Sequence, residues 1–216
     1  DIIYRVRPNG TDHKNVTVAN LKSVEGLAVD WVGNNLYYID RLLSTLTVSR
    51  IANFTDRRVL KADLQKPRAI VVAPLDGYMF WCEWERPARI SRATMDGKNT
   101  IVIRNKELGW PNGLSIHPTK RRVFWCDAQL DRIQHAQFDG SDVRTLAGHA
   151  VVHPFGIAVA GDYIYFSDWR LKAIMRVNIN GTDGVPVYNV SKVRLMGLKI
   201  WSASQQPSSA AHPCSS

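Results

Sequence analysis

The chain has 216 residues, of which 45% are hydrophobic and 22% are charged, and its formal net charge is +9. These proportions are typical of a folded globular protein and exclude a disordered segment. No apolar run approaches the roughly 20 residues that a membrane-spanning helix needs. The excess of Lys and Arg favours partners with acidic surfaces, either acidic proteins or sulfated glycans. The densest basic cluster, at residues 120–122, is too short for a nucleic-acid-binding stripe.

The chain opens with two short predicted strands, between residue 3 and about residue 18, and four copies of a longer pattern follow. Each copy has a strand of small apolar residues and then an aromatic strand that ends in an acidic residue. The apolar strands are Gly26-Leu-Ala-Val29, Ala69-Ile-Val-Val72, Gly113-Leu-Ser-Ile116 and Gly156-Ile-Ala-Val159. The aromatic strands are Leu36-Tyr-Tyr-Ile-Asp40, Met79-Phe-Trp-Cys-Glu83, Val123-Phe-Trp-Cys-Asp127 and Ile164-Tyr-Phe-Ser-Asp168, and their acidic ends lie 43, 44 and 41 residues apart.

The rest of each copy has the pattern of a hairpin. A third strand leads to a turn such as Asp96-Gly97 or Asp139-Gly140, and a short fourth strand returns. Four short strands in about 40–45 residues are typical of a β-propeller blade. Gly and Pro interrupt the chain too often for helical repeats of that period. The sequence therefore predicts an all-β fold, a six-bladed β-propeller over residues 1–206 with four complete blades.

A fifth copy of the apolar strand, Gly197-Leu-Lys-Ile200, stands alone near the end of the chain. It would complete a blade and close the ring if the other strands of that blade came from the start of the chain. Six blades need about one blade more than this sequence supplies, so we expect the propeller to be truncated at its N-terminus, with parts of the closing and preceding blades present.

Five N-glycosylation sequons are spread along the chain, and three of them lie at predicted turn tips. The acceptor residues are Asn9, Asn15, Asn53, Asn180 and Asn189. Five such sequences in one chain indicate an extracellular protein.

The aromatic strands resemble the Tyr-Trp-Thr-Asp (YWTD) repeats of low-density lipoprotein receptor-related proteins. The segments 24–31, Trp110-Pro-Asn-Gly-Leu114 and His153-Pro-Phe155 are similar to that family's inter-blade segments. The resemblance covers about residues 2–206. Residues 207–216 are interpreted as a linker that ends in the first cysteine, Cys214, of an epidermal-growth-factor-like module. No repeat has the motif in full, because the threonine is replaced by Ile39, Cys82, Cys126 and Ser167, and Glu83 replaces an aspartate.

The departures from the motif suggest structural roles. The acidic residue at the end of each aromatic strand is expected to accept hydrogen bonds from backbone amides of the adjoining loop. Cys82 and Cys126 occupy equivalent positions of adjacent blades, where they are either buried thiols or an inter-blade disulfide. Cys214 is expected to have its partner outside this sequence. A zinc site is not expected, because no His lies at ligand spacing from the first two cysteines.

The two faces of the predicted propeller differ in composition. Loops after the second and fourth strands emerge on one face, which collects Trp and Arg residues, the types that dominate binding hot spots. The opposite face receives the Asp-Gly turns and three sequons. We expect a partner to contact the first face at Arg68, Trp84, Glu85, Arg86, Trp110, Trp169 and Arg170. Trp84 and Trp169 are interpreted chiefly as ligand contacts, and Trp110 and Phe155 chiefly as packing residues between blades.

Two histidines, His149 and His153, belong to the same predicted face. Histidine gains charge between neutral and endosomal pH, so both are candidates for acid-dependent release of a partner. The family that the chain resembles releases cargo in acidic endosomes.

The resemblance implies a binding module in the ectodomain of a membrane-anchored endocytic receptor, at the cell surface and in endosomes. Its ligands would be extracellular proteins or lipoproteins, with neighbouring receptor modules alongside. Propellers of Wnt co-receptors and of nidogen-like matrix proteins share these repeats and remain alternatives. Some six-bladed propellers are lactonases or sialidases, which need carboxylates or Arg clusters near the axis. The innermost strands here carry Ala28, Val71, Ser115 and Ala158 instead, so we expect no enzyme activity, cofactor or metal.

Overall fold

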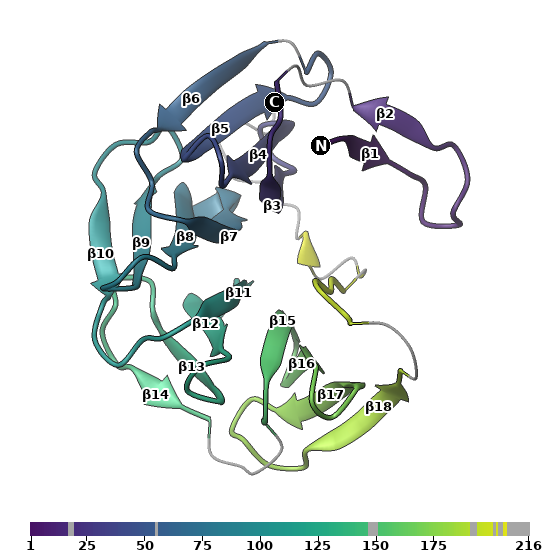
Figure 1. Cartoon of the computed structure of the whole chain (residues 1–216), viewed down its shortest axis with the longest axis vertical. Coiled ribbons are helices and arrows are strands. Elements are labelled where there is room, and N and C mark those ends of the chain that lie inside the picture. Colours follow the sequence, from purple (N-terminus) through teal and green to yellow (C-terminus); the bar gives the residue numbers. More distant parts are fainter. Residues whose placement is uncertain are drawn as a thin grey trace.

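The computed structural model describes residues 1–16, 20–54, 56–146, 151–190, 194–200, 202 and 205–206. These residues form antiparallel sheets arranged around a common centre, with the first strand of each sheet innermost (Figure 1). A single helical element lies wholly within these residues, the 3-10 turn η1 (Pro74–Asp76). Within the same residues, no helix has the length and apolar character needed to span a bilayer.

Four of the sheets have four strands each, and we call them blades 1 to 4 in chain order. Blade 1 contains β3 (Val24–Asp30), β4 (Asn35–Asp40), β5 (Thr45–Arg50) and β6 (Arg57–Lys61). Blade 2 contains β7 (Pro67–Ala73), β8 (Tyr78–Glu83), β9 (Arg89–Thr94) and β10 (Ile101–Arg104). Blade 3 contains β11 (Pro111–His117), β12 (Arg122–Asp127), β13 (Arg132–Gln137) and β14 (Arg144–Thr145). Blade 4 contains β15 (Pro154–Ala160), β16 (Tyr163–Asp168), β17 (Ala173–Asn178) and β18 (Val185–Asn189).

A two-stranded sheet precedes blade 1. It pairs β1 (Ile3–Arg5) with β2 (Lys14–Val16), as predicted for the third and fourth strands of a preceding blade. The four complete blades predicted from the repeats are thus confirmed, whereas a total of six stays a prediction. The tail at 207–216, including Cys214, lies outside the described residues.

Glycines in the innermost strands allow neighbouring blades to approach closely. A Cβ atom on Gly26 would lie 3.0 Å from the carbonyl oxygen of Arg68, and one on Gly113 would lie 2.7 Å from that of Phe155. A Cβ atom on Gly156 would lie 2.6 Å from the carbonyl oxygen of Met196. Residues 196–198 therefore occupy the place of the next inner strand beside blade 4, although the predicted strand at Gly197 is not formed.

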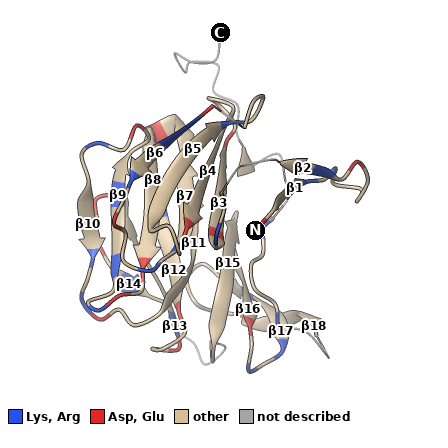
Figure 2. Cartoon of the chain, turned by 45° about the horizontal axis from the view of Figure 1, so that its top comes forward, with Lys and Arg blue, Asp and Glu red and all other residues tan. Residues whose placement is uncertain are grey.

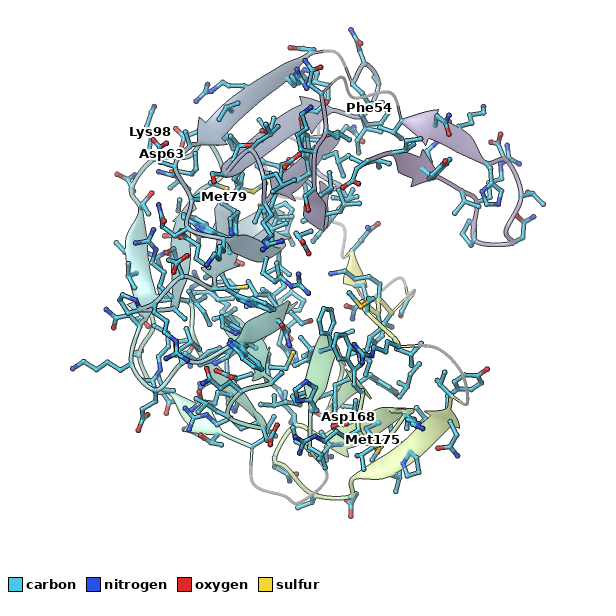
Figure 3. The ribbon with its side chains drawn as sticks, viewed as in Figure 1. Phe54, Asp63, Met79, Lys98, Asp168 and Met175 are labelled. Atoms are coloured by element: carbon cyan, nitrogen blue, oxygen red, sulfur yellow. The ribbon has the colours of Figure 1, made fainter. Side chains whose placement is uncertain are left out.

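The hydrophobic core lies between the blades. Between blades 2 and 3, for example, Phe80 and Ile90 of one sheet pack with Trp125 of the next, and all three are fully buried. Equivalent clusters join blade 1 to blade 2 and blade 3 to blade 4. Met79 and Met175 lie within these layers, whereas Lys98 projects from the rim (Figure 3). Aromatic residues of the second strands thus pack between neighbouring sheets, where each buries a large area.

The acidic residues that end the second strands accept hydrogen bonds from backbone amides, as predicted. Asp127 accepts from the amides of Gly109 and Trp110 in the loop before its blade and of Gln129 and Leu130 in the loop after β12. Asp40 and Asp168 each accept four equivalent amide bonds. Glu83 accepts a single amide bond, from Gln65, and also binds the Trp81 indole and the Arg89 guanidinium.

Cys82 and Cys126 are free, buried thiols, so the disulfide alternative was wrong. Each thiol donates to a carbonyl oxygen of the next inner strand: Cys82 to Pro111 at 3.0 Å and Cys126 to Phe155 at 2.8 Å. Ser167 makes the corresponding bond to Met196 at 3.3 Å. In blades 2, 3 and 4 the residue at this motif position therefore joins consecutive inner strands. Burial raises the pKa of the Cys82 thiol to about 12.

The basic cluster at 120–122 also joins blades. Lys120 pairs with Asp162 of blade 4 at 3.2 Å, and Arg121 pairs with Asp76 of blade 2 at 2.8 Å. Arg122 pairs with Asp142 of its own blade at 2.7 Å. Every charge of the cluster thus has an internal acidic partner, as expected for structural ion pairs. Other Lys and Arg residues are spread over many strands and loops (Figure 2).

Candidate protein-binding face

The connections between strands form two opposite faces. We call one the aromatic face; it consists of the loops after the second strands, at 41–44, 84–88, 128–131 and 169–172, and of the connections that lead into the inner strands. We call the other the turn face; it consists of the hairpin turns after the first and third strands. Asn9, Asn53 and Asn180 lie in hairpin connections of the turn face. Asn15 and Asn189 lie in the outer strands β2 and β18. All five acceptor side chains belong to exposed residues.

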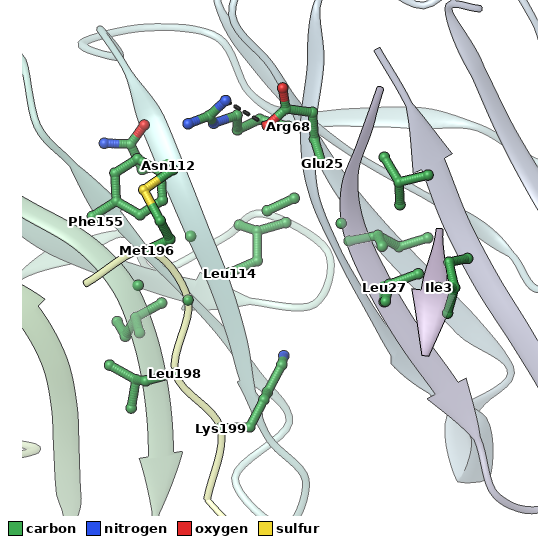
Figure 4. A pocket seen from close by; sticks show the side chains of 18 of the residues that line it. Ile3, Glu25, Leu27, Arg68, Asn112, Leu114, Phe155, Met196, Leu198 and Lys199 are labelled. Atoms are coloured by element: carbon green, nitrogen blue, oxygen red, sulfur yellow. Dashed lines mark hydrogen bonds and ion pairs between the residues drawn. The ribbon is translucent and has the colours of Figure 1, made fainter. Parts of the chain in front are cut away.

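Five residues at one position of the repeat surround the centre of the aromatic face. Each directly precedes the Gly or Ala that begins the apolar unit of an inner strand, so the common register brings all five together. They are Glu25, Arg68, Asn112, Phe155 and Met196. They line a cavity of about 650 Å³ whose walls also include Leu27, Leu114 and Lys199 (Figure 4).

Arg68 is the hub of this ring. Its Nη1 atom lies 2.6 Å from Glu25 Oε2 across the junction of blades 1 and 2. The guanidinium carbon lies 4.5 Å from the Trp84 ring centroid and 5.0 Å from that of Phe155. Only 14% of the Arg68 side chain is exposed. Arg68 therefore holds the aromatic residues in place, and Glu25 already compensates its charge.

Two tryptophans stack beside this hub. The rings of Trp84 and Trp110 have centroids 6.4 Å apart and an interplanar angle of 27°. The Trp84 indole nitrogen donates to the carbonyl oxygen of Pro111 at 3.0 Å, so Trp84 fastens blade 2 to blade 3. Trp110 is 43% exposed and presents the most open ring of this group.

A second aromatic group lies on the other side of Arg68. Trp169 stacks on Phe155 with centroids 4.5 Å apart, and its indole nitrogen donates to the carbonyl oxygen of Leu195 at 2.6 Å. The Arg194 guanidinium carbon lies 5.2 Å from the Trp169 ring centroid. The centroid of the His153 ring lies 5.8 Å from that of the Trp169 ring. The Nδ1 atom of His153 is 3.7 Å from a carboxylate oxygen of Asp131. The two groups and Arg68 form one continuous layer across blades 2, 3 and 4.

The rim of the layer carries exposed charges. Arg86 and Arg170 are exposed, and neither has an ion-pair partner within the described part of the chain. Glu85 pairs with Lys66 at 2.7 Å, and this contact lowers the pKa of the Glu85 carboxyl. Nearer the centre, Asn112 is buried, and its side-chain oxygen has no partner among the described residues.

The structure thus brings Arg68, Trp84, Trp110, Phe155 and Trp169 together, with Glu85, Arg86 and Arg170 around them. His153 joins the layer, whereas His149 lies outside the described residues. Sequence reasoning did not single out Glu25, Asp131 or Arg194. Two of them could have been found by register, because Glu25 occupies the position of Arg68 in its repeat and Arg194 occupies the position of Trp110.

The chemistry of the layer is that of contact surfaces. In the described ranges, no group of three His, Cys, Asp or Glu side chains is placed to hold a metal ion. The layer instead offers open π faces, apolar edges and guanidinium groups, which are the components of protein-binding hot spots.

Comparison with known proteins agrees with the repeat analysis. A family model described as low-density lipoprotein receptor repeat class B matches residues 77–118 and 121–159. The chain is 31% identical over 172 residues to the vitellogenin receptor Yl of Drosophila melanogaster, a match that covers 80% of the chain but 9% of that receptor. It is 28% identical over 176 residues to a human low-density lipoprotein receptor-related protein 5-like protein, covering 82% of the chain and 70% of that protein.

Solved structures give the same architecture. The nidogen propeller in a nidogen/laminin complex superposes with a TM-score of 0.84 at 27% identity, covering 92% of this chain and 76% of that one. Virginiamycin B lyase from Staphylococcus aureus superposes with a TM-score of 0.69 at 16% identity, a likeness that shows the fold alone. The chain therefore contains low-density lipoprotein receptor class B (YWTD) repeats and has the architecture of a YWTD β-propeller.

Proposed function

We propose that this chain is an extracellular, non-enzymatic binding module that recognises a protein or lipoprotein through its aromatic face. The observation that carries the proposal is the continuous layer of Trp84, Trp110, Phe155 and Trp169 around Arg68, with Trp110 open to solvent. Large aromatic residues on rigid elements bind partners at a low cost in side-chain entropy.

The contacts within the layer favour a particular partner chemistry. The indole N–H groups of Trp84 and Trp169 already donate to backbone carbonyls, and Arg68 already pairs with Glu25. The centre is therefore left with ring faces and apolar surface, while Arg86 and Arg170 at the rim keep uncompensated charge. We infer that the partner places apolar side chains on the layer and acidic residues around them, as the net charge of +9 also favours. A sulfated glycan would use the rim but leave the aromatic centre without a role.

The relatives support a biological setting for this module. The likeness to a vitellogenin receptor supports a module that binds a lipoprotein. We propose that the parent protein is a membrane-anchored endocytic receptor that takes this ligand up from the extracellular space. The likeness to a low-density lipoprotein receptor-related protein 5-like protein and to nidogen keeps a Wnt co-receptor or a matrix role as the second candidate. The five sequons support an extracellular location under either reading.

Acid-dependent release is proposed for the same face. His153 contacts both the Trp169 ring and Asp131, and histidine is the residue type whose charge changes between neutral and endosomal pH. Replacing His153 by Gln should leave binding at about pH 7.5 intact and reduce any loss of binding at about pH 5.5.

The test is binding of the secreted, glycosylated chain to three immobilised probes: a vitellogenin lipoprotein, a laminin fragment and heparin. We expect saturable binding to a protein probe and at least a tenfold loss of affinity for the variant Arg86→Glu/Arg170→Glu. The matched control is Arg57→Glu/Arg58→Glu, in the outer strand β6, which should bind as the wild type does. Binding to heparin alone, or to none of the three by a folded chain, would contradict the proposal.

A further inference from the structure

Blades 2, 3 and 4 each place a cation against an aromatic ring at the same position near the turn face. In blades 2 and 4 the ring belongs to the first residue of the second strand and the cation to the fourth residue of the third strand. Arg92 lies 4.3 Å from the Tyr78 ring centroid, and Arg176 lies 4.7 Å from that of Tyr163. Blade 3 reverses the order: Arg122 occupies the tyrosine position and His135 occupies the arginine position.

The reversal creates a buried hydrogen bond between two nitrogen bases. Arg122 Nε donates to His135 Nδ1 at 2.6 Å, and both residues are more than nine-tenths buried. The same guanidinium binds the carboxylate of Asp142 at 2.7 Å and the carbonyl oxygen of Asp142 at 2.6 Å. The His135 ring stacks on Phe124 with centroids 4.6 Å apart. Arg122 thus connects the start of β12 to β13 and to the turn that leads into β14.

The hydrogen bond fixes the protonation state of His135. A guanidinium carries donors only and stays charged throughout the accessible pH range. Nδ1 must therefore present its lone pair, so the imidazole is neutral with its proton on Nε2. A second proton on His135 would remove the acceptor and place two cations in contact inside the protein.

The surroundings of His135 lower the pKa of its imidazole on balance. Burial lowers the pKa of His135 from its ordinary 6.5 to about 4, and the charges of Arg122 on β12 and Arg144 on β14 add to this effect. Asp142 in the turn opposes it. All the charged groups that shift this pKa belong to blade 3.

We propose that the Arg122–His135 pair is an acid-sensitive joint, which holds the β13–β14 turn of blade 3 in place at neutral pH and releases it in acid. The unfolded chain takes up a proton on this histidine at a higher pH than the folded chain does. Stability is therefore lost as the pH falls from about 6.5 to about 4, by about tenfold in the unfolding equilibrium constant per pH unit. The Tyr–Arg pairs of blades 2 and 4 contain no histidine.

The chain itself supplies the control variant. Arg122→Tyr/His135→Arg gives blade 3 the pair that its two complete neighbours already have. Unfolding in urea would be followed by pulse proteolysis of the full 216-residue chain at about pH 7.5, 6.5, 5.5 and 4.5. We expect the wild type to lose stability below about pH 6.5 more steeply than the variant, by about tenfold per pH unit. An equal loss of stability per pH unit in the wild type and the variant would overturn the proposal.

A second measurement does not depend on the variant folding. Hydrogen–deuterium exchange at the imidazole Cε1 position, followed by mass spectrometry, reports the pKa of an individual histidine in the wild-type chain. The proposal requires the exchange rate of His135 to change with a midpoint below about pH 5 in the folded chain and near pH 6.5 in urea. A midpoint near 6.5 in the folded chain would overturn the proposal, since the imidazole would then accept a proton without cost.

Discussion

Blades 2 and 4 have the same strand pattern, yet equivalent side chains have different environments in the two sheets. On the side of blade 2 that faces blade 3, Phe80 and Ile90 have no exposed surface. On the corresponding side of blade 4, Tyr165 and Ile174 are partly exposed, and Tyr188 of β18 is 63% exposed. The first side is covered by a complete blade, whereas residues 196–198 run along the inner edge of the second.

The difference shows that burial in this fold is a property of the junction between blades. A single blade is one layer of twisted β-sheet with side chains on both surfaces, so it has no hydrophobic core of its own. Its aromatic strand becomes a core strand only when a neighbour covers it. The position of a residue within the repeat therefore predicts which blade it faces. Whether that blade is present determines how much the residue contributes to the free energy of unfolding.

The largest expected effect contrasts equivalent aromatic residues on the two sides. Phe80→Ala removes a fully buried ring between blades 2 and 3 and should lower the free energy of unfolding by about 3–5 kcal/mol. Tyr165→Ala removes a partly exposed ring and should cost about 1 kcal/mol. Urea unfolding followed by tryptophan fluorescence measures both. Equal losses would mean that the junction does not determine the contribution of the ring.

A smaller effect is expected at the motif position that joins inner strands. Cys82→Val removes the S–H donor to Pro111 but keeps the apolar volume, and blade 1 already has Ile39 at this position. The Pro111 carbonyl oxygen keeps its bond from the Trp84 indole. The substitution should therefore cost only about 1 kcal/mol in the same urea assay. A loss above about 3 kcal/mol would show that the thiol has a role beyond this single bond.

Much of the fold could be predicted because it repeats. The spacing of the acidic residues predicted the blades, and the amide bonds to Asp127 followed from its place at a strand end. The predicted strand at Gly197 did not form: residues 194–200 have no strand assignment and belong to none of the five sheets.

The candidate site was predictable in its membership but not in its contacts. Trp84 and Trp169 were recognised as residues of one face, yet their indole N–H groups bind carbonyls 27 and 26 residues further along the chain. Arg68 was expected to contact a partner, and the structure pairs its guanidinium with Glu25 at 2.6 Å. Such pairings depend on the angle between neighbouring sheets, which a one-dimensional spacing does not contain. The pair of Arg122 and His135, by contrast, lies within one sheet, and an alignment of the repeats would have placed both residues at the Tyr–Arg positions of blades 2 and 4.

Adding one glycan to each face tests whether the partner binds the aromatic face. Leu42→Asn creates a sequon with Ser44 in a loop of the aromatic face, at a residue that is 68% exposed. Asp139→Asn creates a sequon with Ser141 in a turn of the opposite face, matching the natural one at Asn180. Each single substitution places a bulky, solvated group without disturbing the core.

The measurement is binding of the two glycosylated variants and the wild type to the immobilised vitellogenin lipoprotein and laminin fragment, with glycan occupancy confirmed by mass spectrometry. The account predicts that the glycan introduced by Leu42→Asn abolishes binding and that the one introduced by Asp139→Asn leaves it unchanged. Loss of binding in the second variant with retention in the first would contradict the account and assign recognition to the turn face.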